Sequence, residues 1–127
     1  MQCNFDSLYY GIYAMSTCLG KSSLVVDSAV FNDNARSIYA SGFTQINPVE
    51  VSGSFFNCDQ PIVPDTDSIY MVYLNNSTGF KVHENECSGN LSQPQLQYGV
   101  IVNNSGTDNN YIYHNTFRQL TFGIHGL

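Results

Sequence analysis

The chain has 127 residues, 14 of them Asn, and a formal net charge of −6 from 4 basic and 10 acidic side chains. That length suits a single domain with its own hydrophobic core. So few Lys and Arg argue against a nucleic-acid partner and against binding to an anionic membrane surface. No segment approaches the roughly 18 consecutive apolar residues of a membrane span, so no membrane insertion is predicted.

One pattern recurs five times along the chain. An apolar anchor is followed, usually seven positions later, by a second apolar residue that typically comes after Gly or another small residue. The five pairs are Phe5 with Gly11-Ile12, Phe31 with Ser37-Ile38, Phe55 with Pro61-Ile62, Cys87 with Gly99-Val100, and Phe117 with Gly123-Ile124. Repeats of 20 to 50 residues are typical of solenoids. We therefore expect one domain over residues 1–127 with about five coils.

The units are predicted to consist of strands. No segment has apolar residues at i, i+3, i+4 and i+7 over three helical turns. Short β-branched or aromatic runs bounded by Asn, Gly, Ser or Asp recur instead. They are Leu24-Val25-Val26 leading into Val30-Phe31, Val49-Glu50-Val51, Phe80-Lys81-Val82 and Asn110-Tyr111-Ile112.

Alignment of the units on their anchors places like residues in columns. Five positions before the anchor stand Val26, Val82 and Ile112, joined by Val51 if Phe56 rather than Phe55 is the third anchor. Seven positions after it stand Ile12, Ile38, Ile62 and Ile124, joined by Val100 after an insertion. We expect both columns to face the core.

Of the next two columns, the first is predicted to face solvent and the second to form a corner between strands. One position further on, the opposite strand face would carry Tyr13, Tyr39, Val63, Ile101 and His125. The position after that holds Ala14, Ala40, Pro64, Val102 and Gly126, mostly small residues that suit a tight corner. Asn85 and Asn115 share a column two residues before the anchor, where an Asn ladder between coils is expected.

These repeats resemble the right-handed parallel β-helix repeat family, whose coils carry Asn-x-Phe followed by Gly-Ile about seven residues later. The best copies are Asn115-Thr116-Phe117 with Gly123-Ile124, and Phe5 with Gly11-Ile12-Tyr13. Runs such as Tyr10-Gly11-Ile12-Tyr13-Ala14 look like those of large secreted or surface proteins of Bacteroidetes-type bacteria.

The resemblance implies an all-β, right-handed parallel β-helix, a single-stranded solenoid, and an extracellular or cell-surface location. No signal-peptide pattern accompanies it. The same coil carries lyases, hydrolases, epimerases and adhesins, so it implies no single activity. Cys87 stands where the family has Phe, and Ser37 and Pro61 stand where it has Gly.

Neither end of the sequence carries the atypical polar repeat or helix that usually caps a solenoid. The chain is therefore expected to be an uncapped fragment of a longer protein, with neighbouring coils or capping domains as its partners. The cysteines Cys3, Cys18, Cys58 and Cys87 show neither Cys-x-x-Cys nor zinc spacing with the histidines, so free thiols, mostly buried, are expected. No metal and no cofactor is predicted.

The outward columns next to Val51 and Val82 hold the candidate binding residues. They are Glu50, Lys81, His83, Glu84, Tyr111, Tyr113 and His114, predicted to share one face across three coils. Tyrosine rings with charged and imidazole groups are what contact with an extended polysaccharide requires. The alternative is a solvated sheet face with ordinary Glu50–Lys81 and Glu84–His114 pairs. Six further tyrosines are expected to pack on a second face: Tyr9, Tyr10, Tyr13, Tyr39, Tyr70 and Tyr73.

The sequence contains no recognisable group of catalytic residues, and this disfavours an enzymatic role. Asp65 and Asp67 stand beside Pro64, which favours a turn over a paired-carboxylate site, and Arg36 joins no acidic group. The predicted role is a structural or adhesive scaffold with polysaccharide contact. The alternative is a fragment of a carbohydrate-active enzyme of lyase, hydrolase or epimerase type, with its catalytic residues on other coils.

Overall fold

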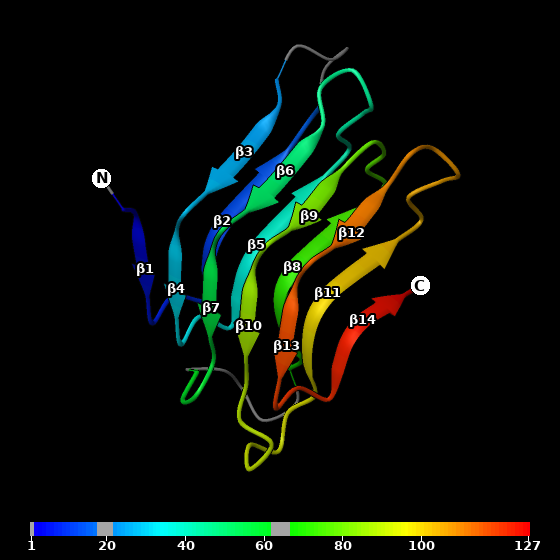
Figure 1. The fold of residues 1–127 in the computed structure, drawn as a ribbon. Helices are drawn as coiled ribbons and strands as arrows, with labels where there is room; N and C mark the ends of the chain where they lie inside the picture. The colour runs from blue at the N-terminus through cyan, green and yellow to red at the C-terminus, as the bar shows by residue number, and fades with distance from the viewer. Residues whose placement is uncertain (1, 18–21, 62–66) are drawn as a thin grey trace.

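The chain folds into a parallel β-solenoid (Figure 1), in a computed structural model that describes residues 2–17, 22–61 and 67–127. Three parallel sheets run along it. Sheet A contains β1 (Asn4–Asp6), β4 (Val30–Asn32), β7 (Phe55–Asn57), β10 (Glu86–Ser88) and β13 (Thr116–Arg118). Sheet B contains β2 (Tyr10–Met15), β5 (Arg36–Ser41), β8 (Ile69–Asn75), β11 (Gln97–Asn103) and β14 (Phe122–Gly126). Sheet C contains β3 (Leu24–Asp27), β6 (Val49–Ser52), β9 (Lys81–His83) and β12 (Tyr111–Tyr113).

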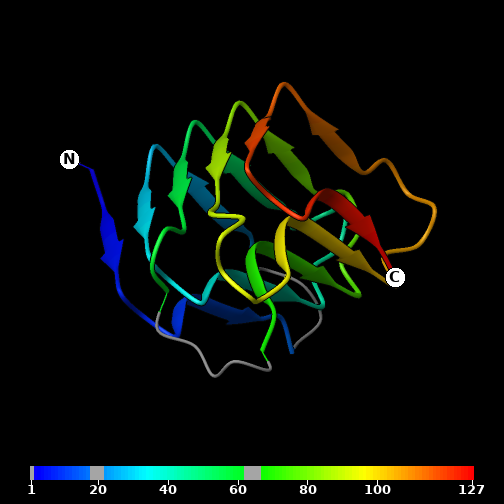
Figure 2. The ribbon, with the colours of Figure 1, turned by 90° about the horizontal axis from the view of Figure 1, so that it is seen from below.

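The chain visits sheets A, B and C in that order and then repeats the circuit, as the view in Figure 2 shows. Each strand pairs in parallel with the equivalent strand of the neighbouring coil. The strands of the described residues make four complete circuits and two strands of a fifth. The predicted all-β parallel solenoid is confirmed, and the five predicted anchors belong to the five strands of sheet A.

The anchors form the centre of the core. Phe31 and Phe56 are fully buried, and the Phe31 ring stacks between those of Phe5 and Phe56 at 4.7 and 4.8 Å. Cys87 continues the column, since it pairs in register with Phe56 and Phe117. The third anchor is therefore Phe56, and the alternative Phe55 points outward with 38% of its surface exposed.

The inner column of sheet B corrects the prediction for the third coil. Ile62 lies outside the described residues, and Val72 pairs in register with both Ile38 and Val100. The prediction allowed an insertion in the fourth coil but kept a spacing of seven residues after the third anchor. The connection from β7 to β8 is much longer than those from β1 to β2 and from β4 to β5, so the spacing of seven fails in the third coil.

The same shift changes the two columns that follow. Tyr73 pairs with Tyr39 and Ile101, and Leu74 pairs with Ala40 and Val102; the predicted Val63 and Pro64 lie outside the described residues. The column predicted as a tight corner is wrong in kind as well. Its members lie within strands of sheet B, and Ala40 and Leu74 are fully buried core residues.

The glycine before the second apolar residue has a packing reason. A Cβ added at Gly99 would lie 2.5 Å from the Phe117 ring and from the Gly123 carbonyl oxygen. A Cβ at Gly11 would likewise meet the Phe31 ring at 3.1 Å. The anchor rings thus occupy the space that a side chain would need, which accounts for the recurring Gly-Ile dipeptide.

The corner between sheets C and A uses left-handed backbone in four successive coils. Ser28, Gly53, Glu84 and His114 have φ between 53° and 57°. Asn85 and Asn115 follow two of these residues, and the predicted Asn ladder is present: the Asn85 side-chain amide donates to the Asn115 side-chain oxygen at 2.9 Å. Two of the predicted binding residues, Glu84 and His114, are therefore corner residues.

Three cysteines lie in the described residues, and all are free thiols. Cys58 and Cys87 are buried, as predicted, and burial raises the pKa of each thiol to about 12. Cys3 is exposed, contrary to the expectation of a packed position, and Cys18 lies outside the described residues.

Candidate functional site

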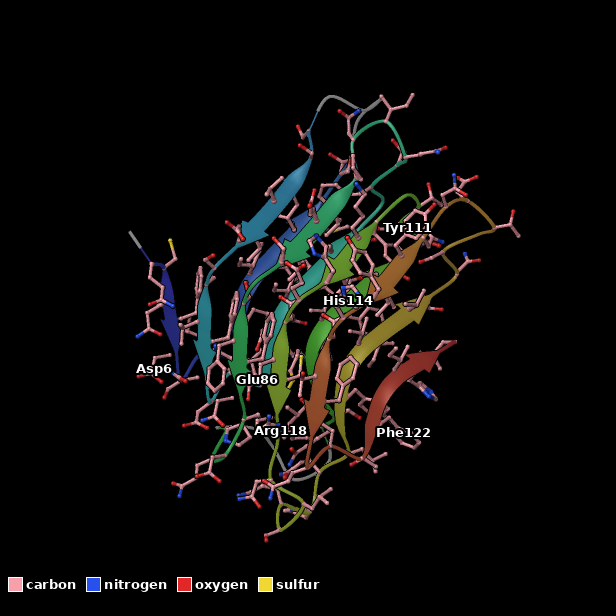
Figure 3. All side chains as sticks on the ribbon, viewed as in Figure 1. Asp6, Glu86, Tyr111, His114, Arg118 and Phe122 are labelled. Atoms are coloured by element: carbon pink, nitrogen blue, oxygen red, sulfur yellow. The ribbon has the colours of Figure 1, made fainter. Side chains whose placement is uncertain are left out.

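The predicted binding residues do lie on one side of the solenoid, on sheet C and its corner. Glu50, Lys81 and Tyr111 are register partners on β6, β9 and β12, and His83 pairs with Tyr113 two positions along. In Figure 3, Tyr111 lies on β12 and His114 follows at the corner before β13. Glu84 occupies the equivalent corner position one coil earlier.

Within this group, the contacts centre on His83. Its Nε2 lies 3.2 Å from Glu50 Oε1 and its Nδ1 lies 3.7 Å from Glu84 Oε2. The imidazole also stacks on the Tyr113 ring at 4.8 Å with parallel planes. Glu50 and Glu84 thus each direct a carboxylate oxygen toward a different nitrogen of the His83 ring.

Glu50 and Lys81 are the cross-strand partners that the alternative expected, but no ion pair between described residues joins them or joins Glu84 to His114. Among the described residues, the ion-pair contacts of both glutamates are to His83. The His83 side chain is only 14% exposed. His83 Nε2 is therefore engaged with Glu50, whereas its buried Nδ1 has no hydrogen-bond partner among the described residues. The exposed side chains of the group, which a ligand could contact, are Lys81, Glu84, Tyr111, Tyr113 and His114.

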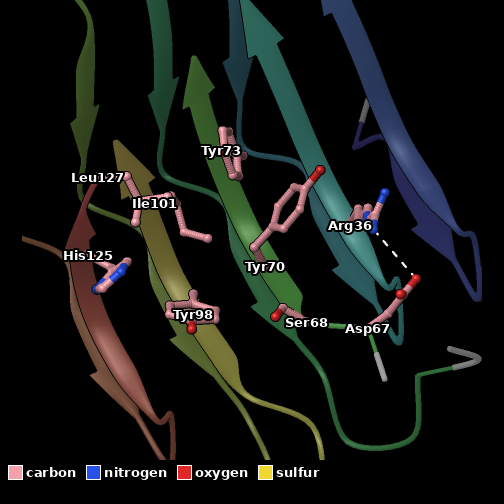
Figure 4. A pocket seen from close by; sticks show the side chains of 9 residues that line it. All are labelled: Arg36, Asp67, Ser68, Tyr70, Tyr73, Tyr98, Ile101, His125 and Leu127. Atoms are coloured by element: carbon pink, nitrogen blue, oxygen red, sulfur yellow. Dashed lines mark hydrogen bonds and ion pairs between the residues drawn. The ribbon is translucent and has the colours of Figure 1, made fainter. Parts of the chain in front are cut away.

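A hollow of about 410 Å³ opens on a different face, the outer side of sheet B (Figure 4). Such a volume lies within the roughly 300–1,000 Å³ typical of ligand sites. One side is formed by Arg36, Asp67, Ser68, Tyr70 and Tyr73, and the other by Tyr98, Ile101, His125 and Leu127. Six of the lining residues come from the neighbouring strands β5, β8, β11 and β14, whose main-chain ladder fixes their spacing, while Asp67, Ser68 and Leu127 lie just outside the strands.

A break in the aromatic packing accounts for this hollow. Tyr13, Tyr39 and Tyr73 form a column of rings 4.8 and 5.5 Å apart along the solenoid. The column stops at Tyr73, because its register partner on β11 is Ile101, a smaller side chain.

A second group of rings lies beyond the break. Tyr98 stacks on Phe122 at 5.2 Å and contacts His125 at 5.3 Å. Tyr70 and Tyr98 are register partners on adjacent strands, yet no ring contact between described residues joins the two groups. The hollow therefore separates the two aromatic groups, and Ile101 forms part of its lining at the position where the Tyr column ends.

Arg36 and Asp67 bring opposite charges to one side of the hollow. Arg36 Nη2 lies 3.5 Å from Asp67 Oδ2, and Nη1 donates to the Tyr10 hydroxyl. The guanidinium carbon lies 4.7 Å from the Tyr9 ring centre and 5.2 Å from that of Tyr10. This packing holds the arginine in a fixed position.

Two phenols on this side of the hollow, those of Tyr9 and Tyr70, have a raised pKa and stay protonated at neutral pH. The Tyr9 hydroxyl donates to Asp67 Oδ2 at 2.7 Å, and this hydrogen bond is the main reason that the pKa of Tyr9 is raised. Burial raises the pKa of Tyr70 strongly. These hydroxyls therefore act as neutral hydrogen-bonding groups.

Sequence reasoning missed this hollow. The sequence pattern favours a turn at Asp67 and gives Arg36 no acidic partner, because the two residues are 31 positions apart in the chain and meet only through the stacking of coils. The sequence does contain a signal for the hollow in the outward column of sheet B. When Tyr73 replaces Val63 in that column, three successive coils carry Tyr and the fourth carries Ile101, which marks the end of the aromatic stack.

In the described part of the chain, no group of three or more His, Cys, Asp or Glu side chains could hold a metal ion. Nor does that part contain a helix long and apolar enough to cross a membrane. No protein-family model, curated protein or solved structure matches this chain.

Proposed function

We propose that this chain is a rigid β-solenoid segment of a secreted or cell-surface protein and that it binds polysaccharide in the hollow on sheet B. The observation that carries the proposal is the break between two groups of aromatic rings, which leaves a space of about 410 Å³ beside charged and hydroxyl groups. The secreted location and membership of the right-handed parallel β-helix repeat family belong to this proposal, and they rest on the repeat pattern.

The chemistry of the lining supports a sugar ligand. Aromatic rings offer apolar faces against which the C–H faces of a sugar ring pack, and their hydroxyls remain available for hydrogen bonds. Tyr73 and Tyr98 line the hollow, and Ile101 adds apolar surface between them. The Tyr73 hydroxyl accepts from the Asn103 side-chain amide at 3.2 Å and keeps its own proton to donate to a ligand. Asp67 and Ser68 add acceptors and a donor for sugar hydroxyls. A few polar groups placed around an apolar space is the usual composition of a ligand site.

The packing of the Tyr13–Tyr39–Tyr73 column limits where a sugar ring can stack on a tyrosine ring. Rings stacked on one another cover each other's faces, so the column presents ring edges along most of its length. Of the two rings that end the column, Tyr73 lines the hollow and Tyr13 does not. The ligand is therefore expected to contact the column at Tyr73 and to leave Tyr13 untouched.

The sheet C group is a second candidate surface for the same function. Tyr111 and Tyr113 are 49% and 40% exposed, and Lys81 stands beside them. This surface offers exposed rings and a cation. An enzymatic role for a longer parent protein is the alternative function; Asp67 is the one carboxylate residue that lines the hollow in the described residues, whereas glycoside hydrolysis uses two.

The test is a polysaccharide-binding screen on this chain with three variants. Tyr98→Ala is expected to weaken binding by roughly tenfold, because the ring forms one side of the hollow. Tyr13→Ala is the matched control on the same sheet and should bind as the parent does. Tyr111→Ala/Tyr113→Ala tests sheet C: loss of binding in this variant alone would move the site there.

Two other results of the screen would change the proposal. Release of shorter sugars during the incubation would favour the enzymatic alternative. Absence of binding to every polysaccharide tested would overturn the carbohydrate proposal. Each variant should keep the parent's melting temperature, so that a loss of binding reports on contact and not on folding.

A further inference from the structure

The charges beside the hollow bear on which class of sugar enters it. Arg36 is the cation that lines the hollow, and Asp67 is its ion-pair partner at 3.5 Å. Asp67 is also fixed by the Tyr9 hydroxyl, which donates to the same Oδ2 at 2.7 Å. The positive charge is therefore already matched by a carboxylate that the protein itself supplies.

A ligand carboxylate would meet unfavourable electrostatics at this place. It would have to approach Asp67, or displace it from both Arg36 and Tyr9. The chain as a whole carries a net charge of −6, which adds a weaker repulsion for polyanions. Like charges brought together at a contact are strongly disfavoured.

Sugar hydroxyls face no such penalty. A hydroxyl donates to a carboxylate and accepts from a guanidinium, so one hydroxyl pair can use Asp67 and Arg36 without separating them. Asp67 Oδ1 accepts no hydrogen bond from the described residues, whereas Oδ2 accepts two. The pair is thus positioned to bind a neutral ring through its hydroxyl groups.

We propose that the hollow takes an uncharged sugar residue of a neutral polysaccharide, and that the Arg36–Asp67 pair disfavours sugars that carry a carboxylate. This inference rests on the proposed function and adds the class of ligand to it. Asp67 decides between neutral sugars and sugars with a carboxylate, because its negative charge neutralises the positive charge of Arg36 beside the hollow.

The experiment compares neutral oligosaccharides and oligouronates of equal length on the parent chain. Neutral glucans, xylans and mannans form the first set, and polygalacturonate and alginate fragments form the second. The parent is expected to bind at least one neutral ligand at least about tenfold more tightly than any oligouronate. Because this ranking needs no variant, it tests the inference even if a substitution impairs folding.

Two variants then separate local from overall charge. Asp67→Asn leaves Arg36 uncompensated, and it is expected to raise oligouronate affinity by about tenfold. Asp108→Asn removes one negative charge from an exposed turn and is the matched control. Its oligouronate affinity should stay within about twofold of the parent's, because exposed distant charges are screened by salt.

The outcomes are distinct. If the parent prefers oligouronates, the inference is wrong while the proposed function stands. If neither set binds, the proposed function fails and the inference fails with it. Equal gains in Asp67→Asn and Asp108→Asn, or no gain in either, would show that Asp67 does not decide the ligand class.

Discussion

Asn85 and Asn115 occupy the same position in successive coils, and the side-chain oxygen of Asn115 accepts from both the backbone and the side-chain amide of Asn85, at 3.0 and 2.9 Å. Asn85 repeats this role one coil earlier, where its own oxygen accepts from the Ser54 backbone N–H at 2.9 Å. Each Asn thus satisfies a backbone donor at the corner of the preceding coil. The ladder contributes to stability because such buried groups are costly when left unpaired.

The first prediction concerns this ladder. Asn85→Ala leaves the buried Ser54 N–H without its partner and removes a side-chain donor from the Val51 carbonyl. Its cost should be roughly 1–3 kcal/mol in the free energy of unfolding, measured by urea denaturation. Asn115→Ala removes the same group at a more exposed position, where water can replace it, and should cost less. Equal losses in the two variants would show that burial does not set the cost.

The second prediction tests the core column. Ile38→Asp places an unpaired carboxylate at a fully buried position and should unfold the solenoid. The same substitution at Ile46, which is 87% exposed, should leave the melting temperature unchanged. Circular dichroism during heating distinguishes the two. A cooperative transition at the parent's temperature in Ile38→Asp would contradict the assignment of this column to the core.

The third prediction concerns the recurring glycine. Gly99→Ala places a methyl group 2.5 Å from the Phe117 ring and from the Gly123 carbonyl, so one of them must move. Such overpacking should lower the free energy of unfolding by about 1–3 kcal/mol. Gly126→Ala is the control, because nothing lies within 4 Å of its added Cβ. If both substitutions were neutral, close approach of the ring would not explain the glycine.

The fourth prediction is a pH dependence. The thiol of Cys87 has its pKa raised from 9.0 to about 12, mainly by burial. Between these values the unfolded chain releases the proton while the folded chain keeps it, so this thiol lowers stability as pH rises from about 9 to about 12. Below pH 9 it has no effect. The parent should lose roughly 1 kcal/mol more than Cys87→Ala between pH 8 and pH 10. Urea denaturation at both pH values measures this, and parallel losses would contradict it.

The parts of the fold that were predicted share one property: they depend on residues repeated from coil to coil. The inner columns of sheet C and the anchors of sheet A were found because each coil repeats the same burial, so Val26, Val51 and Val82 occupy equivalent positions. The third coil was misplaced on sheet B because its longer connection breaks the spacing. A repeat pattern carries no information about how many residues a surface connection holds.

The candidate site likewise has features that the sequence determines and features that depend on the tertiary structure. The sequence alone determined the parallel solenoid, its Asn ladder and the sharing of one face by Glu50, His83 and Tyr113, since residue periodicity sets which side chains point together. Only the tertiary structure decided that His83 engages both glutamates and that Arg36 meets Asp67. It also decided that the Tyr column ends at Ile101 and leaves a hollow. These contacts depend on coil register and side-chain size across segments far apart in the chain, which local patterns do not encode.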